Sequence, residues 1–109
     1  MDLNAIKEKL KTIEKIGFSK HFYEPKVQIR NIQDHEIINS LKNPGKLIGF
    51  DYQGEDEKGE KYALLFNKSN KYDLRLIISI KDKSLNVITS HIQNIKRRKV
   101  LEQWLKKRR

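Results

Sequence analysis

Two apolar segments joined by a short charged connection constrain the fold of this chain more than any other feature. Residues 73–80 are almost continuous leucine and isoleucine, and residues 84–92 alternate in polarity. The first pattern is typical of a strand covered on both faces, and the second is typical of a strand with two different faces. Only residues 81–83 separate the segments, so they are predicted to form a β-hairpin. One side of its second strand carries Leu85, Val87, Thr89 and His91.

The register of this hairpin suggests a polar cluster. Pairing of Ile80 with Ser84 brings Arg75 opposite Thr89. The face that they share would then carry Arg75, Ile77, Ser79, Val87, Thr89 and His91. An arginine, a threonine and a histidine on an otherwise apolar sheet form a candidate site. The alternative is that the arginine near the strand end reaches water and that the threonine is present for its β-propensity.

A basic segment follows the hairpin. Residues 93–109 place apolar side chains at helical spacing, with Asn94 as the expected N-cap. The first turn of this predicted helix carries Lys96, Arg97, Arg98 and Lys99. Cations at the positive end of a helix dipole are unfavourable alone, but with the free backbone amides they suit a phosphate group. The alternative is a solvated charge run.

The overall charge agrees with a polyanionic partner. The chain has 109 residues, enough for a single domain, with 24 basic residues against 14 acidic ones and a net charge of +10. Most of the excess lies in the predicted C-terminal helix, as is typical of a nucleic-acid binder, although ribosomal, membrane-surface or acidic-partner proteins share the pattern. Absence of cysteine excludes disulfides and thiolate metal sites. With no signal peptide and no apolar span expected, a cytoplasmic location without membrane contact is predicted.

The rest of the chain predicts two helices and two further strands. Residues 3–16 show amphipathic spacing that ends at Gly17, with Leu3, Ile6, Leu10 and Ile13 forming a seam that packs on the chain's own sheet or on a second copy. A second helix is expected at about 34–42. Strands 46–52 and 61–67 flank an acidic segment expected to be a mobile turn. The predicted fold is α+β: two N-terminal helices, a four-stranded antiparallel meander sheet and a C-terminal basic helix.

The region from residue 18 onward resembles a known family. It combines His21, a run Arg30-Asn31-Ile32, a short helix ending at Asn43-Pro44, and a last strand that reads Val87-Ile-Thr-Ser-His91 before the basic segment. This order is similar to RelE/BrnT-type toxins and to the barnase, EndoU, colicin and RelE-like nucleases of phages and mobile elements. The resemblance covers roughly residues 18–105, and it divides the single domain into an N-terminal helix, 1–17, and a RelE/barnase-like core, 18–109.

The resemblance implies a metal-independent endoribonuclease that uses no cofactor and in which a 2′-hydroxyl attacks the adjacent phosphate. The candidate catalytic residues are His21, Arg75, Thr89 and His91, and the candidate nucleic-acid-binding residues are Lys20, Lys96, Arg97, Arg98 and Lys99. The last strand lacks the tyrosine that RelE-like toxins often use. Candidate partners are RNA, free or on the ribosome, an antitoxin protein, and a second copy bound through the N-terminal helix.

Several alternatives to this function remain open. A lone histidine such as His21 is more often structural or incidental than catalytic, and His35 in a polar helix start is expected to face solvent. The whole chain is alternatively a non-catalytic RNA- or DNA-binding module that grips the backbone through its basic C-terminal helix. No metal site is predicted, because the three histidines lack metal-ligand spacing with carboxylates.

Overall fold

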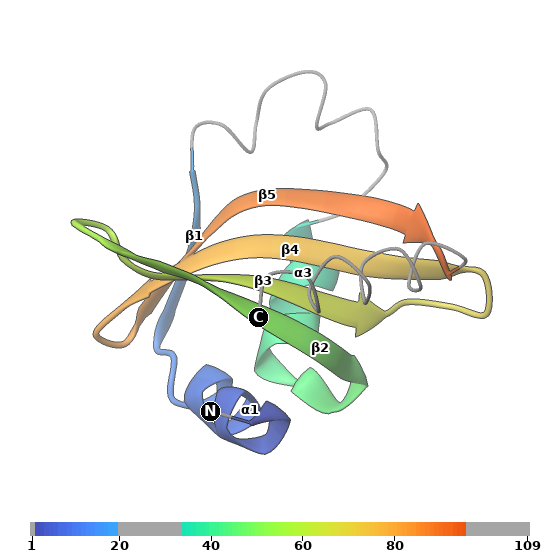
Figure 1. Cartoon of the computed structure of the whole chain (residues 1–109), viewed down its shortest axis with the longest axis horizontal. Coiled ribbons are helices and arrows are strands. Elements are labelled where there is room, and N and C mark those ends of the chain that lie inside the picture. Colours follow the sequence, from blue (N-terminus) through green and yellow to red (C-terminus); the bar gives the residue numbers. More distant parts are fainter. Residues whose placement is uncertain (1, 20–33, 96–109) are drawn as a thin grey trace.

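The structure is a computed structural model, which describes residues 2–19 and 34–95. Within these ranges the chain forms two α-helices, a short 3-10 helix and a five-stranded sheet (Figure 1). In chain order the elements are α1 (Leu3–Lys11), β1 (Lys15–Phe18), α3 (Asp34–Lys42), η2 (Pro44–Lys46), β2 (Leu47–Asp56), β3 (Gly59–Asn67), β4 (Tyr72–Lys81) and β5 (Ser84–Asn94).

The sheet is mixed, with the strand order β1-β5-β4-β3-β2. Strands β2 to β5 form the predicted antiparallel meander, but β1 adds a fifth strand parallel to β5, with Lys15 opposite Ser84 and Phe18 opposite Val87. The prediction of a four-stranded antiparallel sheet is therefore wrong. Strand β1 covers an edge of β5 whose backbone groups would otherwise lack strand partners.

The first helix is shorter than its sequence pattern predicted. Asp2 caps it by accepting a hydrogen bond from the backbone amide of Ala5 at 2.8 Å, and the helix ends at Lys11. Beyond Thr12 the apolar side chains still pack against the core, but they do so from extended chain, where Ile16 alternates with polar or small neighbours. Ile16 lies three residues after Ile13, as in a helix, and two residues before Phe18, as in a strand, so its spacing alone extended the predicted helix too far.

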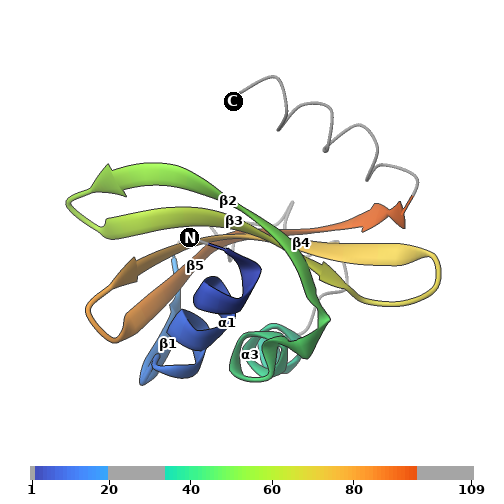
Figure 2. The same cartoon turned by 60° about the horizontal axis from the view of Figure 1, so that its bottom comes forward.

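The predicted second helix is confirmed as α3. Both α1 and α3 lie on the same face of the sheet (Figures 1 and 2). Between helices and sheet lies a single core, formed by Ile6, Leu10, Ile37, Leu41, Leu47, Tyr62, Leu64, Phe66, Leu74, Leu76, Ile78, Ile80, Leu85 and Val87. The N-terminal seam belongs to it, since Ile6 and Leu10 are buried there and Leu3 and Ile13 pack against it.

The two hairpins are tighter than expected. Strand β2 continues to Asp56 and β3 begins at Gly59, so most of the acidic segment 53–60 is strand and not a mobile turn. Gly59 has φ +112°, and a Cβ there would collide with the carbonyl group of Ile80. This position therefore requires glycine for both its conformation and its space.

The predicted N-cap of the C-terminal helix is wrong. Strand β5 includes Gln93 and Asn94, so Asn94 is the last strand residue and not a helix N-cap. The remainder of the predicted helix, with Lys96, Arg97, Arg98 and Lys99, lies outside the residues that the structure describes. The two helices described, α1 and α3, both precede the meander.

Candidate functional site

A β-bulge in β5 determines which side chains of the last hairpin share a face. Ile80 lies opposite Leu85 and not opposite Ser84, so the predicted register was off by one residue. Further along, the register shifts again: Ile78 pairs with Val87, whereas Ile77 pairs with Thr89. Ile88, between Val87 and Thr89, therefore has no partner on β4. It is the extra residue of a β-bulge in β5.

The bulge is held by hydrogen bonds from the residue that follows β1, the strand that was not predicted. Ser19, which directly follows β1, donates its backbone amide to the carbonyl of Val87 at 2.9 Å. Its hydroxyl donates to the carbonyl of Ile88 at 3.2 Å. The carbonyl groups at the irregular step of β5 therefore have partners in the segment that continues β1.

The bulge reverses the two faces of β5 at its midpoint. Before the bulge, Leu85 and Val87 point into the core; after it, Ser90 is buried and Ile92 packs against that core. Strand alternation then places Thr89 and His91 on the opposite face, called here the far face because it lies opposite α1 and α3. The prediction that Leu85, Val87, Thr89 and His91 share one side is wrong for this reason.

On the far face, Arg75 of β4 lies directly opposite His91 of β5. Thr89 is one step away on the same face, opposite Ile77. Directly opposed residues in an antiparallel pair have Cβ atoms about 4.5–5.5 Å apart, so a guanidinium and an imidazole occupy neighbouring positions. Arg75, Thr89 and His91 are all half-buried. Arg75 forms no ion pair with any carboxylate in residues 2–19 and 35–95.

A polar row lies beside this cluster, and the sequence analysis did not single it out. Asp73 is fully buried and pairs with Gln93 on one side and Asn67 on the other. The amide Nδ2 of Asn67 donates to the Asp73 carboxylate at 3.3 Å. Asp73 lies two residues before Arg75, so both belong to the far face. A charged residue opening an apolar strand was the available signal.

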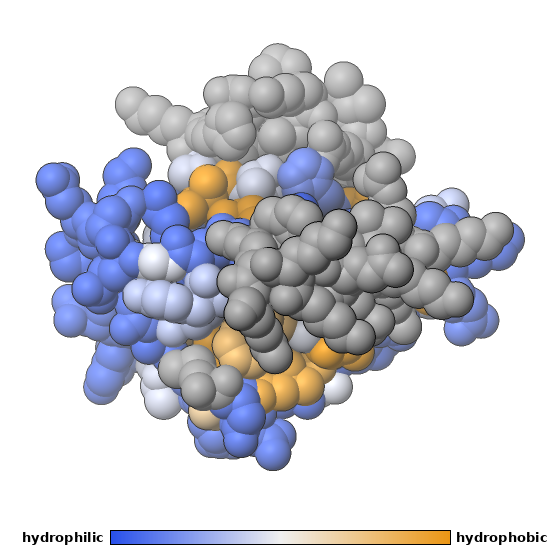
Figure 3. All heavy atoms as spheres, viewed as in Figure 1, coloured by the Kyte–Doolittle hydropathy of each residue, from blue (hydrophilic) through white to orange (hydrophobic). Residues whose placement is uncertain are grey.

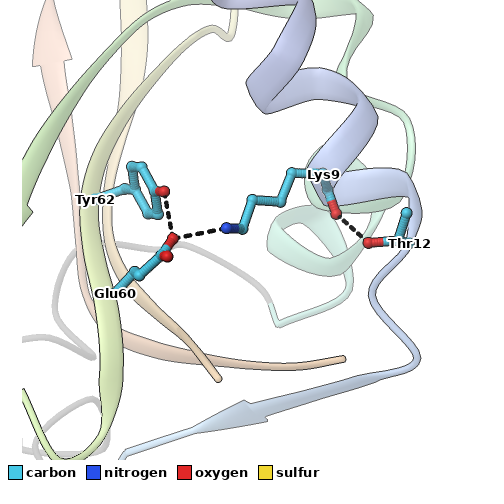
Figure 4. Close-up of polar contacts among 4 residues, drawn as sticks. All are labelled: Lys9, Thr12, Glu60 and Tyr62. Carbon is cyan, nitrogen blue, oxygen red and sulfur yellow. Dashed lines mark hydrogen bonds and ion pairs between the residues drawn. The ribbon is translucent and has the colours of Figure 1, made fainter. Parts of the chain in front are cut away.

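A second polar cluster lies on the opposite side, between α1 and the sheet (Figure 4). The carboxylate of Glu60 accepts hydrogen bonds from Lys9 Nζ and from the hydroxyl of Tyr62, each at 2.6 Å. The bond from Lys9, with that from Tyr62, lowers the pKa of Glu60 below its ordinary value. Burial, reinforced by Glu60, raises the pKa of Tyr62. These residues join helix to sheet, and the neutral tyrosine is a donor to the carboxylate.

His21 and Lys20, like the basic run 96–99, lie outside the described residues. His35, near the start of α3, is exposed as expected. Across the described part of the chain, no group of three or more His, Asp or Glu residues is placed to hold a metal ion.

Neither a protein-family model, nor a curated protein, nor a solved structure is significantly similar to this chain. The resemblance to RelE-like and barnase-like nucleases therefore stays a prediction from the sequence. In the ranges described, neither helix is long and apolar enough to cross a membrane.

Proposed function

We propose that this chain is a small endoribonuclease that cleaves RNA without a metal ion, with its active centre on the far face at Arg75, Thr89 and His91. The observation that supports the proposal is the direct opposition of Arg75 and His91 across β4 and β5, with Thr89 on the same face. These three side chains supply a cation, a proton-transfer group and a hydrogen-bond donor within the span of one phosphodiester.

The roles follow from the chemistry of RNA cleavage. The 2′-hydroxyl forms a bond to the adjacent phosphorus, its proton passes to a base, and the bond to the 5′-oxygen breaks as that oxygen gains a proton. Histidine is the side chain best suited to proton transfer near neutral pH, and His91 is assigned this role. Arg75 neutralises the charge that grows on the phosphate oxygens, and Thr89 donates a hydrogen bond to one of them.

Two sequence segments complete the proposal. His21 is assigned the second proton transfer, because the reaction needs both a base and an acid. Lys96, Arg97 and Arg98 follow β5 closely in the chain and are assigned to flanking phosphates, where they would strengthen binding in a salt-dependent way.

The test separates turnover from affinity. Arg75→Ala and His91→Ala should each slow cleavage of structured RNA by about a hundredfold or more, and change RNA affinity far less. Lys42→Gln is the matched control, because it removes one exposed positive charge from the last turn of α3, which lies on the opposite face of the sheet. Circular dichroism would verify that each variant is folded.

Cleavage by the wild-type chain should continue in EDTA, because the assigned catalytic groups are all side chains. It should leave a 2′,3′-cyclic phosphate, because the 2′-hydroxyl is the attacking group. The substrate is total RNA, with a parallel sample containing ribosomes. If neither sample is cut while RNA is still bound, the catalytic proposal is wrong and the chain is a nucleic-acid-binding module. Equal losses of affinity and turnover in Arg75→Ala would likewise reduce that residue to a binding role.

A further inference from the structure

A cavity of about 560 Å³ opens at the end of the sheet where both hairpins turn. In Figure 1 these turns lie at the same end, beside β1, and Figure 3 shows hydrophilic side chains gathered there. Residues from β1, β4, β5 and the β2–β3 turn line the cavity, among them Lys15, Gly17, Lys58, Ser79, Lys81 and Asn86. No residue assigned to the active centre belongs to it.

The register places this cavity on the far face. Gly17 lies opposite Asn86, and Asn86 lies opposite Ser79, which continues the row of alternate β4 residues that includes Arg75. Ile16 and Leu85, which pack in or against the core, also line the cavity, between the far-face positions of β1 and β5. The cavity and the Arg75 cluster are therefore two parts of one surface.

The charge of the cavity is positive. Its lining includes three lysines and no carboxylate. Lys81 Nζ donates to the backbone carbonyl of Glu57 at 3.0 Å, which fixes that ammonium group near the turn. Lys15 and Lys58 form no ion pair with carboxylates of the described ranges.

The acidic residues of the same two hairpins are gathered elsewhere. They line a separate cavity with Lys9 of α1, and its acidic members are Glu55, Asp56, Glu57, Glu60 and Asp82. Lys81 lines both cavities, whereas Lys15 and Lys58 line only the one without carboxylates, which is left for an external anion. A compact ammonium group is a common partner of a phosphate.

We propose that this cavity binds a backbone phosphate of single-stranded RNA, one that flanks the phosphate cleaved at Arg75 and His91. This inference rests on the proposed function. Ser79 and Arg75 are four residues apart on β4, a span of about 13 Å in extended chain. One phosphate cannot reach both places, so the substrate crosses the far face with at least one nucleotide between them. Ile77, half-buried midway along this path, offers an apolar contact for a base.

Gly17 allows a direct test. Its backbone does not have positive φ, and a Cβ there would meet only Asn86 Oδ1 at 3.7 Å, an ordinary contact. Gly17→Asp therefore places a negative charge in the cavity without strain, and Gly17→Ala is its matched neutral control. Affinity would be measured by fluorescence anisotropy with a labelled oligouridylate of about twelve nucleotides, long enough for a single-strand site.

We expect Gly17→Asp to weaken binding by at least about tenfold and Gly17→Ala to stay within about twofold. The double variant Lys15→Gln/Lys58→Gln should lower the salt slope by about 0.7, the contribution of one single-strand phosphate. Equal affinity of the aspartate and alanine variants would overturn the cavity as a phosphate site. Cleavage by the wild-type chain is measured separately, and its absence would overturn the catalytic proposal. Only the ratio of the affinities of Gly17→Asp and Gly17→Ala tests whether the cavity binds a phosphate.

Discussion

Removal of the Glu60 carboxylate should destabilise the fold more than removal of either of its hydrogen-bond donors. Glu60 Oε2 accepts from Lys9 Nζ and from Tyr62 OH, both at 2.6 Å, and so ties α1 to β3 through one oxygen atom. The side chains of Lys9 and Glu60 are 29% and 33% exposed, whereas Tyr62 as a whole is only 2% exposed. Without the carboxylate, the partly exposed Lys9 can still be hydrated, whereas the buried Tyr62 hydroxyl loses its acceptor.

The magnitudes follow from this difference. A buried hydroxyl that loses its acceptor costs about 1–3 kcal/mol, and a partly exposed ion pair is worth about 0.2–1 kcal/mol. Glu60→Ala loses both, so its expected cost is about 2–3 kcal/mol. Lys9→Ala keeps the bond between Tyr62 and Glu60 and should cost about 1 kcal/mol or less. Tyr62→Phe keeps the buried ring and the ion pair, and should cost about 1 kcal/mol.

The free energy of unfolding would be measured by urea denaturation followed by far-ultraviolet circular dichroism. Equal m-values are needed for the comparison, because a changed m-value would signal a changed denatured state. The reasoning is refuted if Glu60→Ala lies within about 0.5 kcal/mol of the wild type, a difference typical of an ordinary surface substitution. It is refuted equally if Lys9→Ala costs as much as Glu60→Ala.

Three further predictions follow from the same structure. Because the folded-state pKa of Glu60 is lowered, its contribution to stability should be complete above the ordinary carboxylate pKa and fall as the pH drops below it; Glu60→Gln should flatten that acid limb of the unfolding curve. Because the folded-state pKa of Tyr62 is raised, stability should fall as the pH rises above about 10, and Tyr62→Phe should remove this loss. Gly59→Ala should cost several kcal/mol, against about 1 kcal/mol for Gly54→Ala, which shares the positive φ but has open space; thermal unfolding would separate them.

Local chemistry in the sequence was sufficient to predict several elements. Helix α3, from Asp34 to Lys42, follows from apolar spacing and from the Asn43-Pro44 stop that ends it. The antiparallel pairing of β4 with β5 follows from two apolar segments joined by a connection too short for anything but a hairpin. Such predictions succeed because periodicity, breakers and turn residues act within a few positions along the chain.

The tertiary structure decided the faces and the partners. No local signal pairs residues 15–18 with β5, because a parallel pairing between distant segments depends on which edge of the sheet needs a neighbour. Ile88 likewise looks like any other strand residue in the sequence, although as the bulge it exchanges the two faces of β5.

The candidate site shows the same division. The sequence marked Arg75, Thr89 and His91 as unusual residues for an apolar sheet, and this required only their residue types. It paired Arg75 with Thr89, whereas the structure pairs Arg75 with His91. Because side chains alternate with a period of two, a single extra residue changes every face beyond it. Residue types come from the sequence, but which of them meet is a property of the register, and only the assembled sheet determines the register.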